Sequence, residues 1–159
     1  MNKLTLEFEP LRGISPSALG FADGEMVGAI KMRVVNGGEN LTLLSINWSL
    51  QALLDWLMVN TGSIIEDRPP SFIVWQGSIY KSIAQYYEST DEPPDEQDDE
   101  IFEYRRRHEL AFGLRGIAVP EIFMGYGVDG YEISGILDGK EFSFPVDIPQ
   151  FLSGISRFP

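Results

Sequence analysis

The sequence predicts a single α+β domain, in which a mostly antiparallel β-sheet packs against three or four helices. Two observations indicate this class. Runs that alternate polar and apolar residues occur near both ends of the chain, and apolar residues spaced three and four apart occur between them. A chain of 159 residues is also long enough to bury roughly two-thirds of its unfolded surface in one core. We therefore expect one domain over residues 1–159.

The N-terminal strands are expected within the first 46 residues. Residues 1–10 alternate polar and apolar side chains, and residues 26–35 carry a partly alternating, β-branched pattern. Asn36-Gly37-Gly38 supplies the positive φ angles that a hairpin turn needs, so residues 41–46 are expected to return as its second strand. The Gly-, Ser- and Pro-rich segment 12–23 is predicted to be a loop.

The clearest helix is predicted near residues 49–60. Its apolar stripe consists of Leu50, Leu53, Leu54, Leu57 and Met58. Gly62 stands where a left-handed residue would end such a helix. Residues 78–87 and 95–107 are expected to form further helices. The apolar run 71–76 predicts a short buried strand, with a helical turn as the alternative.

The C-terminal third predicts a β-meander followed by a helix. Strands are expected over residues 109–114, 121–126, 131–137 and 141–146. Asp129-Gly130 and Asp138-Gly139 each separate two apolar runs, as hairpin turns do. Asp147 is a good N-cap for a last helix over residues 147–157, which together with the helix near 49–60 would cover one face of the sheet.

The chain is negatively charged, and most of the excess negative charge lies in one segment. Twenty-four acids against 12 bases give a net charge of −12, and nine of these acids lie between Glu88 and Glu103, where no base occurs. The remainder carries 15 acids and 12 bases. Phosphate binding needs clustered Lys and Arg, so this balance disfavours nucleic acid and anionic membranes as partners and favours a basic protein.

Residues 88–100 form the candidate binding segment, an acidic loop followed by the start of a helix. Whether the segment is ordered is left open. The candidate binding residues are Asp91, Glu92, Asp95, Glu96, Asp98, Asp99 and Glu100. They admit two interpretations: a solvated surface, as charge runs usually are, or a surface for a basic partner. A calcium loop of the EF-hand type is excluded because two prolines interrupt the acids and no glycine occurs among them.

Three motifs with catalytic associations have simpler explanations. Gly125 to Gly130 match G-x-G-x-x-G, but a strand follows instead of a helix, so a hairpin turn is expected. Ser78 and Lys81 match S-x-x-K without its partner motifs, and Ser78 is expected to cap a helix. His108 is the only histidine and lies after three arginines near a helix end, which favours a hydrogen-bonding or dipole role. We assign no catalytic residue, metal or cofactor.

Cysteine usage and hydropathy bear on the compartment. The chain has no cysteine, which excludes disulfides and thiolate sites and suits a reducing cytoplasm. No run approaches the ~20 apolar residues that span a bilayer. The alternating N-terminus differs from a signal peptide. A cytoplasmic protein without membrane association is expected.

Three segments carry a family resemblance. Residues 106–114 (RRHELAFGL), Pro120-Glu121-Ile122 and residues 144–149 (FPVDIP) resemble small bacterial proteins of unknown function, some of which are similar to immunity proteins of bacterial toxin systems. The resemblance covers about the last third of the chain and transfers no residue role. It implies a cytosolic protein that neutralises a toxin by binding it.

Three functional hypotheses follow. The first is a non-catalytic module that binds a basic protein, as an immunity protein does. The second is a small enzyme in which carboxylates such as Glu121, Asp129 or Glu132 lie near His108 or the tyrosines in a cleft. The third is a structural subunit of an oligomer, which would expose a large apolar patch. The sequence leaves the oligomeric state open.

Overall fold

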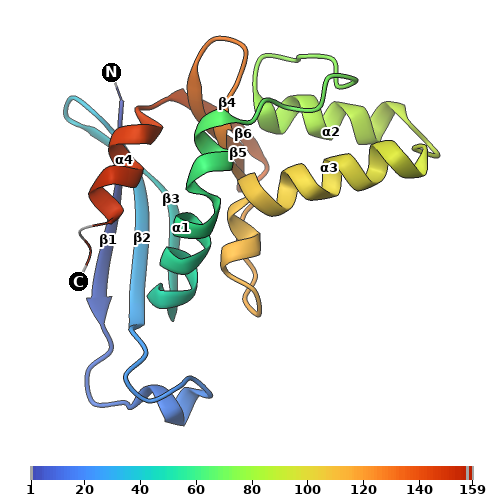
Figure 1. The fold of residues 1–159 in the computed structure, drawn as a ribbon. Helices are drawn as coiled ribbons and strands as arrows, with labels where there is room; N and C mark the ends of the chain where they lie inside the picture. Colours follow the sequence, from blue (N-terminus) through green and yellow to red (C-terminus); the bar gives the residue numbers. More distant parts are fainter. Residues whose placement is uncertain (1, 157, 159) are drawn as a thin grey trace.

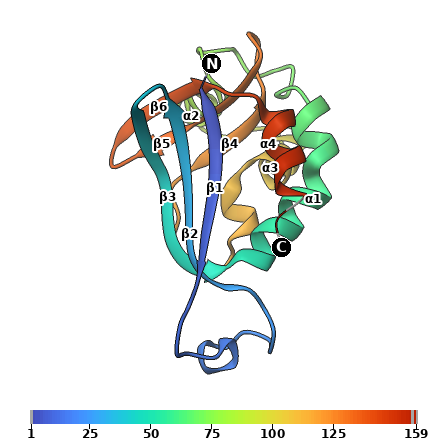
Figure 2. The same cartoon turned by 90° about the vertical axis from the view of Figure 1, so that its left-hand side faces the viewer.

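The computed structural model describes residues 2–156 and 158, and this part of the chain forms an α+β domain with two three-stranded antiparallel sheets (Figures 1 and 2). The α+β class predicted from the sequence is confirmed. The first sheet contains β1 (Lys3–Pro10), β2 (Val27–Asn36) and β3 (Glu39–Ser49), and the second contains β4 (Ile122–Tyr126), β5 (Tyr131–Leu137) and β6 (Lys140–Pro145). The α-helices are α1 (Leu50–Glu66), α2 (Ile79–Ser89), α3 (Asp95–His108) and α4 (Ile148–Ile155), and two short 3-10 helices are η1 (Pro16–Leu19) and η2 (Leu110–Gly113).

The first sheet is built from two antiparallel pairings. β1 pairs with β2 in an unbroken register from Lys3 to Pro10. β2 and β3 are joined by Gly37 and Gly38, and the φ of +63° at Gly37 is the left-handed conformation that the glycine permits. The register shifts after Met32, which leaves Leu43 as an extra residue on β3.

Helix α1 follows β3 directly and carries the main core. The side chain of Ser49 accepts a hydrogen bond from the Ala52 N–H at 3.1 Å and caps the helix. The helix continues to Glu66, so the prediction that Gly62 would end it was wrong. Its leucine stripe packs with residues of the first sheet, β4, β5 and α4 in one buried cluster. Figures 1 and 2 show α1 and α4 on the same side of the first sheet.

The second sheet is a meander of three strands. Asp138 and Gly139 both have positive φ values, +51° and +78°, as the turn between β5 and β6 requires. Between β4 and β5, the Gly127 N–H donates to the Gly130 carbonyl at 2.8 Å. The G-x-G-x-x-G sequence therefore forms a hairpin turn, as predicted. An isolated parallel bridge joins Asn2, just before β1, to Val146, just after β6.

Two predicted strands were wrong. Residues 71–76 contain no strand; the Ile73 N–H turns back to the Pro70 carbonyl at 3.0 Å. Half-buried side chains of this run instead cover the cluster between α2 and α3. Residues 109–114 form the 3-10 helix η2 after a single bridge between Glu109 and Phe123. This turn brings Gly113 against Trp56, where an added Cβ would lie 2.9 Å from the Trp56 side chain.

Candidate functional site

The candidate binding segment lies at the outer end of a helical hairpin. Figure 1 shows α2 and α3 side by side, pointing away from the first sheet, with their connection at the far end. The segment 88–100 thus divides between the end of α2, a connection over residues 90–94 and the first turns of α3. We call the part from Asp91 to Glu100 the acidic tip.

All seven predicted binding residues are exposed and lie together in the acidic tip. Asp91 and Glu92 lie in the connection, and the other five lie at the start of α3. None of the seven forms an ion pair within the part of the chain that the structure describes. The α3 dipole favours negative charge at this N-terminus, so the helix tolerates the cluster without a cation.

The three arginines of α3 bond to carboxylates outside the acidic tip. Arg105 Nε donates to the buried Glu109 carboxylate at 2.8 Å, and Arg107 Nε donates to Asp67 at 3.0 Å. Arg106 pairs with Glu103 at 2.8 Å, and Arg107 Nη1 lies 3.7 Å from the same carboxylate, as the i, i+4 spacing predicts. Asp95 precedes Arg105 by ten residues, about 15 Å along a helix, which exceeds the Debye length of about 8 Å. The arginines therefore offset the charge of Glu103, whereas the acidic residues in the first turn of α3 lie beyond the screening distance.

A small apolar cluster holds the two helices together. Its buried members are Ile79, Tyr80, Ile83, Ile101, Tyr104 and Phe123. Near the tip, the Tyr86 hydroxyl donates to the Gln97 side-chain oxygen, and the Tyr86 ring packs against Phe72 with centroids 5.4 Å apart. These contacts position the first turns of α3 relative to α2.

The N-terminus of α2 is capped by the second sheet as well as by its own serine. Ser78 Oγ accepts from the Lys81 N–H at 3.1 Å, as predicted. From β5, Glu132 Oε2 accepts from the Ile79 N–H and Ser134 Oγ from the Tyr80 N–H, each at 3.1 Å. Three helix-start donors are thereby satisfied. The sequence analysis missed the two caps from β5 because they come from residues more than 50 positions away.

Glu132 is a buried carboxyl whose role is structural. Only 7% of its surface is exposed. Burial raises the pKa of Glu132, while hydrogen bonds from Ser134 and the Ile79 N–H oppose the rise. Since Glu132 already accepts the Ile79 N–H, it holds the start of α2 and does not face solvent.

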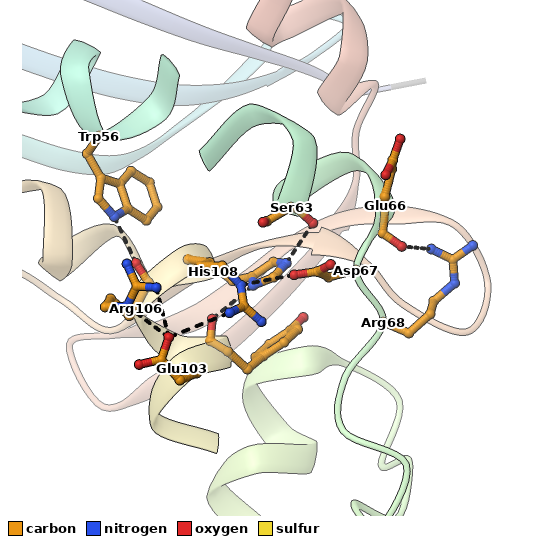
Figure 3. Close-up of polar contacts among 10 residues, drawn as sticks. Trp56, Ser63, Glu66, Asp67, Arg68, Glu103, Arg106 and His108 are labelled. Carbon is orange, nitrogen blue, oxygen red and sulfur yellow. Dashed lines mark hydrogen bonds and ion pairs between the residues drawn. The ribbon is translucent and has the colours of Figure 1, made fainter. Parts of the chain in front are cut away.

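His108 joins the ends of α1 and α3 in the interior (Figure 3). Its Nδ1 lies 2.9 Å from the Tyr104 carbonyl, its Nε2 lies 3.1 Å from the Ser63 carbonyl, and its ring stacks on Tyr104. Burial lowers the pKa of His108, and the two carbonyls and the nearby Asp67 carboxylate partly offset this effect. The predicted hydrogen-bonding role is confirmed.

The residues of the enzyme hypothesis do not form a common cleft. His108 has no exposed surface. Glu121 precedes β4 and Asp129 follows it, so the two exposed acids stand at opposite ends of a five-residue strand, about 17 Å in length. Glu132 is occupied by the α2 cap. The arrangement offers no path for a substrate to reach His108.

The described residues offer no evident site for a metal ion or for a small molecule at the acidic tip. No group of three or more His, Asp or Glu side chains is placed to hold a metal ion among residues 2–156 and 158. Three hollows of about 590, 480 and 520 Å³ border the first sheet, and none of them is lined by a residue of the acidic tip. The tip is a projecting surface, which suits a macromolecular partner better than a small molecule.

One exposed aromatic residue accompanies the acids. Phe102 is 48% exposed on α3 and packs edge-on against Phe112 of η2, with ring centroids 5.7 Å apart. At 100° per residue, Phe102 lies on the same helix face as Asp95, Asp98 and Asp99. The sequence analysis missed this residue, although the i, i+3, i+4, i+7 spacing is visible in the sequence.

Comparisons with known proteins found no family model, curated protein or solved structure that matches this chain. Among the described residues, no helix has the length and apolar character needed to cross a membrane.

Proposed function

We propose that this protein is a non-catalytic module that binds a basic protein through the acidic tip, in the manner of an immunity protein. The single observation that carries the proposal is the exposure of seven carboxylates, without ion pairs in the described chain, at the outer end of the α2–α3 hairpin. The residues of the resemblance lie elsewhere, in the end of α3, in η2 and around α4. These residues support a protein of the immunity-protein kind, but they do not identify the surface that binds the partner.

Electrostatics supports a basic partner. An anionic end that projects from the domain steers a cationic surface toward itself and raises the association rate, and this gain falls as salt screens the charges. The start of α3 is anchored through Gln97 and the hairpin cluster, so few backbone degrees of freedom are lost on binding.

Phe102 supplies the apolar component of the same surface. Interfaces gain most of their affinity from a few desolvated side chains, often aromatic, surrounded by polar residues. Phe102 stands one to two helical turns from Asp95, Asp98 and Asp99 and is braced by Phe112. A partner with a basic rim around an apolar contact fits this arrangement.

The test is a capture experiment with charge-matched variants. The tip variant reverses Asp95, Glu96, Asp98, Asp99 and Glu100 to lysine. The control variant reverses five exposed acids outside the tip: Asp23, Glu39, Glu66, Glu121 and Glu141. Each variant carries five charge reversals, which take the net charge from −12 to −2. Each immobilised protein is incubated with lysate of the source cell, and captured proteins are identified by mass spectrometry.

We expect the wild type and the control variant to capture the same basic protein and the tip variant to lose it. With that protein purified, Phe102→Ala should weaken binding by about tenfold or more, mainly through faster dissociation. Capture that is equal for the tip variant and the wild type would refute the proposal. Equal loss in both charge variants would show that total charge, and not the tip, is responsible.

A further inference from the structure

The loop between β1 and β2 encloses an apolar hollow at one end of the first sheet. It comprises residues 11–26, and Figures 1 and 2 show it projecting beyond the ends of β1 and β2, well away from the α2–α3 connection. At its base, the Leu11 N–H donates to the Val27 carbonyl at 3.1 Å, and farther along Phe21 packs edge-on against Trp48 with ring centroids 5.0 Å apart. The loop is therefore attached to the sheet at more than one point. Compact loops whose ends lie close together frequently carry a function.

The hollow has the size and composition of a small-molecule site. Its volume is about 520 Å³, within the usual range for ligand pockets. Eight of its nine lining residues are apolar, and the ninth is Glu25. The two other hollows beside the first sheet are more polar, because amide, hydroxyl or charged side chains form a larger share of their linings. Ligand sites typically combine an apolar lining with a few polar groups, so this hollow fits a small ligand best.

The floor of the hollow belongs to the main core. Phe8, Met26 and Phe158 line the hollow and also pack against the buried cluster beneath the first sheet. The Met26 carbonyl accepts a hydrogen bond from the Leu50 N–H at 2.7 Å, which ties this part of the lining to the start of α1. A ligand therefore meets a surface that is already formed, and little affinity is lost to ordering it.

The loop adds apolar side chains that the rest of the described chain leaves uncovered. Ile14 lines the hollow and is 51% exposed, and Leu19 of η1 is 48% exposed. None of the four residues of η1 is buried. An apolar ligand in the hollow removes part of this surface from water, which is the main source of affinity for such a ligand.

The carboxylate of Glu25 sets the charge that a ligand can carry. Glu25 is partly exposed, and its Oε1 accepts a long hydrogen bond of 3.4 Å from the Ala22 N–H. Within the described residues, Glu25 forms no ion pair. An ammonium group on the ligand complements this carboxylate, whereas a carboxylate on the ligand is repelled by it.

We propose that this hollow binds an apolar small molecule that carries a single ammonium group, such as a primary alkylamine. The alkyl chain lies over Phe8, Met26 and Phe158, and the ammonium group lies beside Glu25. The net charge of −12 adds a general attraction for cations, which falls as salt is added. Binding at this site does not depend on the function proposed for the acidic tip.

The test titrates the full chain with octylamine, 1-octanol and octanoate, which share the same alkyl length and differ in charge. Binding is followed by two-dimensional NMR. We expect octylamine to bind most tightly, with a dissociation constant of about 0.1–1 mM, and octanoate to bind most weakly. Hexylamine, which is shorter by two methylenes, should bind about tenfold more weakly than octylamine because less apolar surface is buried.

A pair of charge-matched variants separates Glu25 from the net charge. Glu25→Gln should weaken octylamine binding by about threefold to fivefold and leave 1-octanol binding unchanged. Glu141→Gln removes one negative charge from an exposed position on β6, outside the lining of the hollow, and should leave octylamine binding unchanged. Equal octylamine affinity in the wild type and in Glu25→Gln would overturn the proposal, and so would an equal loss in both variants.

A second measurement locates the ligand. Intermolecular nuclear Overhauser effects should connect the octylamine chain to the methyl groups of Ile14 and Met26, which line the hollow. Contacts to Gln150 and Ser153 alone would place the ligand in the hollow beside α4 and overturn the proposal. The absence of binding up to about 10 mM octylamine would also overturn it. The tip variant with five lysines should keep the contacts to Ile14 and Met26, which separates a failure here from a failure of the proposed function.

Discussion

The cluster beneath the first sheet and the cluster of the α2–α3 hairpin are stabilised by different means. Among the described residues, the first contains 21 buried hydrophobic residues from both sheets and from α1 and α4, whereas the second contains six. The smaller cluster is supplemented by polar contacts that are buried, such as the Glu132 and Ser134 caps, or partly buried, such as the His108–Ser63 contact and the Arg105–Glu109 pair. The hairpin therefore depends on specific hydrogen bonds where the main core depends on apolar burial.

This difference has a consequence for pH. Apolar contacts do not titrate, whereas Glu132 and His108 are ionisable groups inside the fold with shifted pKa values. The hairpin that presents the acidic tip is therefore expected to be the part of the molecule most sensitive to pH.

The largest effect is expected in the main core. Leu53 is fully buried on α1, and Leu53→Ala should lower the free energy of unfolding by about 2–5 kcal/mol through the lost burial and the cavity left behind. Urea denaturation followed by circular dichroism measures this. Leu53→Met, which nearly conserves volume, is the control and should cost less than about 1.5 kcal/mol. A change below 1 kcal/mol for the alanine variant would contradict the assignment of this core as the main source of stability.

Removal of the α2 cap should have the next largest effect. Glu132→Ala leaves the buried Ile79 N–H without an acceptor and should cost about 1–3 kcal/mol. Glu132→Gln retains a side-chain oxygen at this position and should cost less. Hydrogen exchange should become faster at the start of α2 and remain unchanged in the first sheet. Equal stability of the alanine and glutamine variants would show that the cap contributes nothing.

The pH dependence of Glu132 has a defined sign. Its pKa is raised in the folded state, so its contribution to stability is complete below the unfolded pKa near 4.5 and is lost as the pH rises through the folded value. The wild type should therefore gain stability relative to Glu132→Gln when the pH is lowered from 7 toward 4.5. Paired urea titrations across this range measure the difference. A difference that does not vary with pH would contradict the burial of an ionisable group here.

The smallest effects are expected from His108 protonation at mildly acidic pH and from the partly exposed Asp67–Arg107 ion pair beside it. The pKa of His108 is lowered in the folded state, so its contribution to stability is present above the unfolded value of 6.5 and is lost as the pH falls below 6.5 and through the folded value. Relative to His108→Asn, the wild type should lose free energy of unfolding between pH 7.5 and 5.5.

Asp67→Asn breaks the ion pair with Arg107 and should lower the free energy of unfolding by about 0.2–1 kcal/mol, less at high salt. A larger effect from Asp67→Asn than from Glu132→Ala would reverse the comparison.

Local patterns in the sequence predicted most of the elements. The leucine stripe identified α1, the Asp-Gly pairs identified two hairpin turns, and Ser78 was recognised as a helix cap, because each depends on residues within one turn of one another. The exposure of the acidic residues also followed from their charge. These features could be predicted because the interactions that produce them involve residues close together in the sequence.

The remaining features depend on residues that are distant in the sequence. Residues 71–76 and 109–114 have the composition of strands, but a strand forms only where another strand has an unpaired edge beside it. In the folded chain, residues 71–76 instead cover the hairpin cluster, and residues 109–114 place Gly113 against Trp56. The caps that Glu132 and Ser134 provide, and the contact of His108 with Ser63, join positions 45 to 54 residues apart. Local sequence patterns were enough to predict the fold class, most helices and turns, and the position of the acidic charge. They could not predict which strands lack a neighbour or which polar groups are buried, because both depend on how distant parts of the chain pack together.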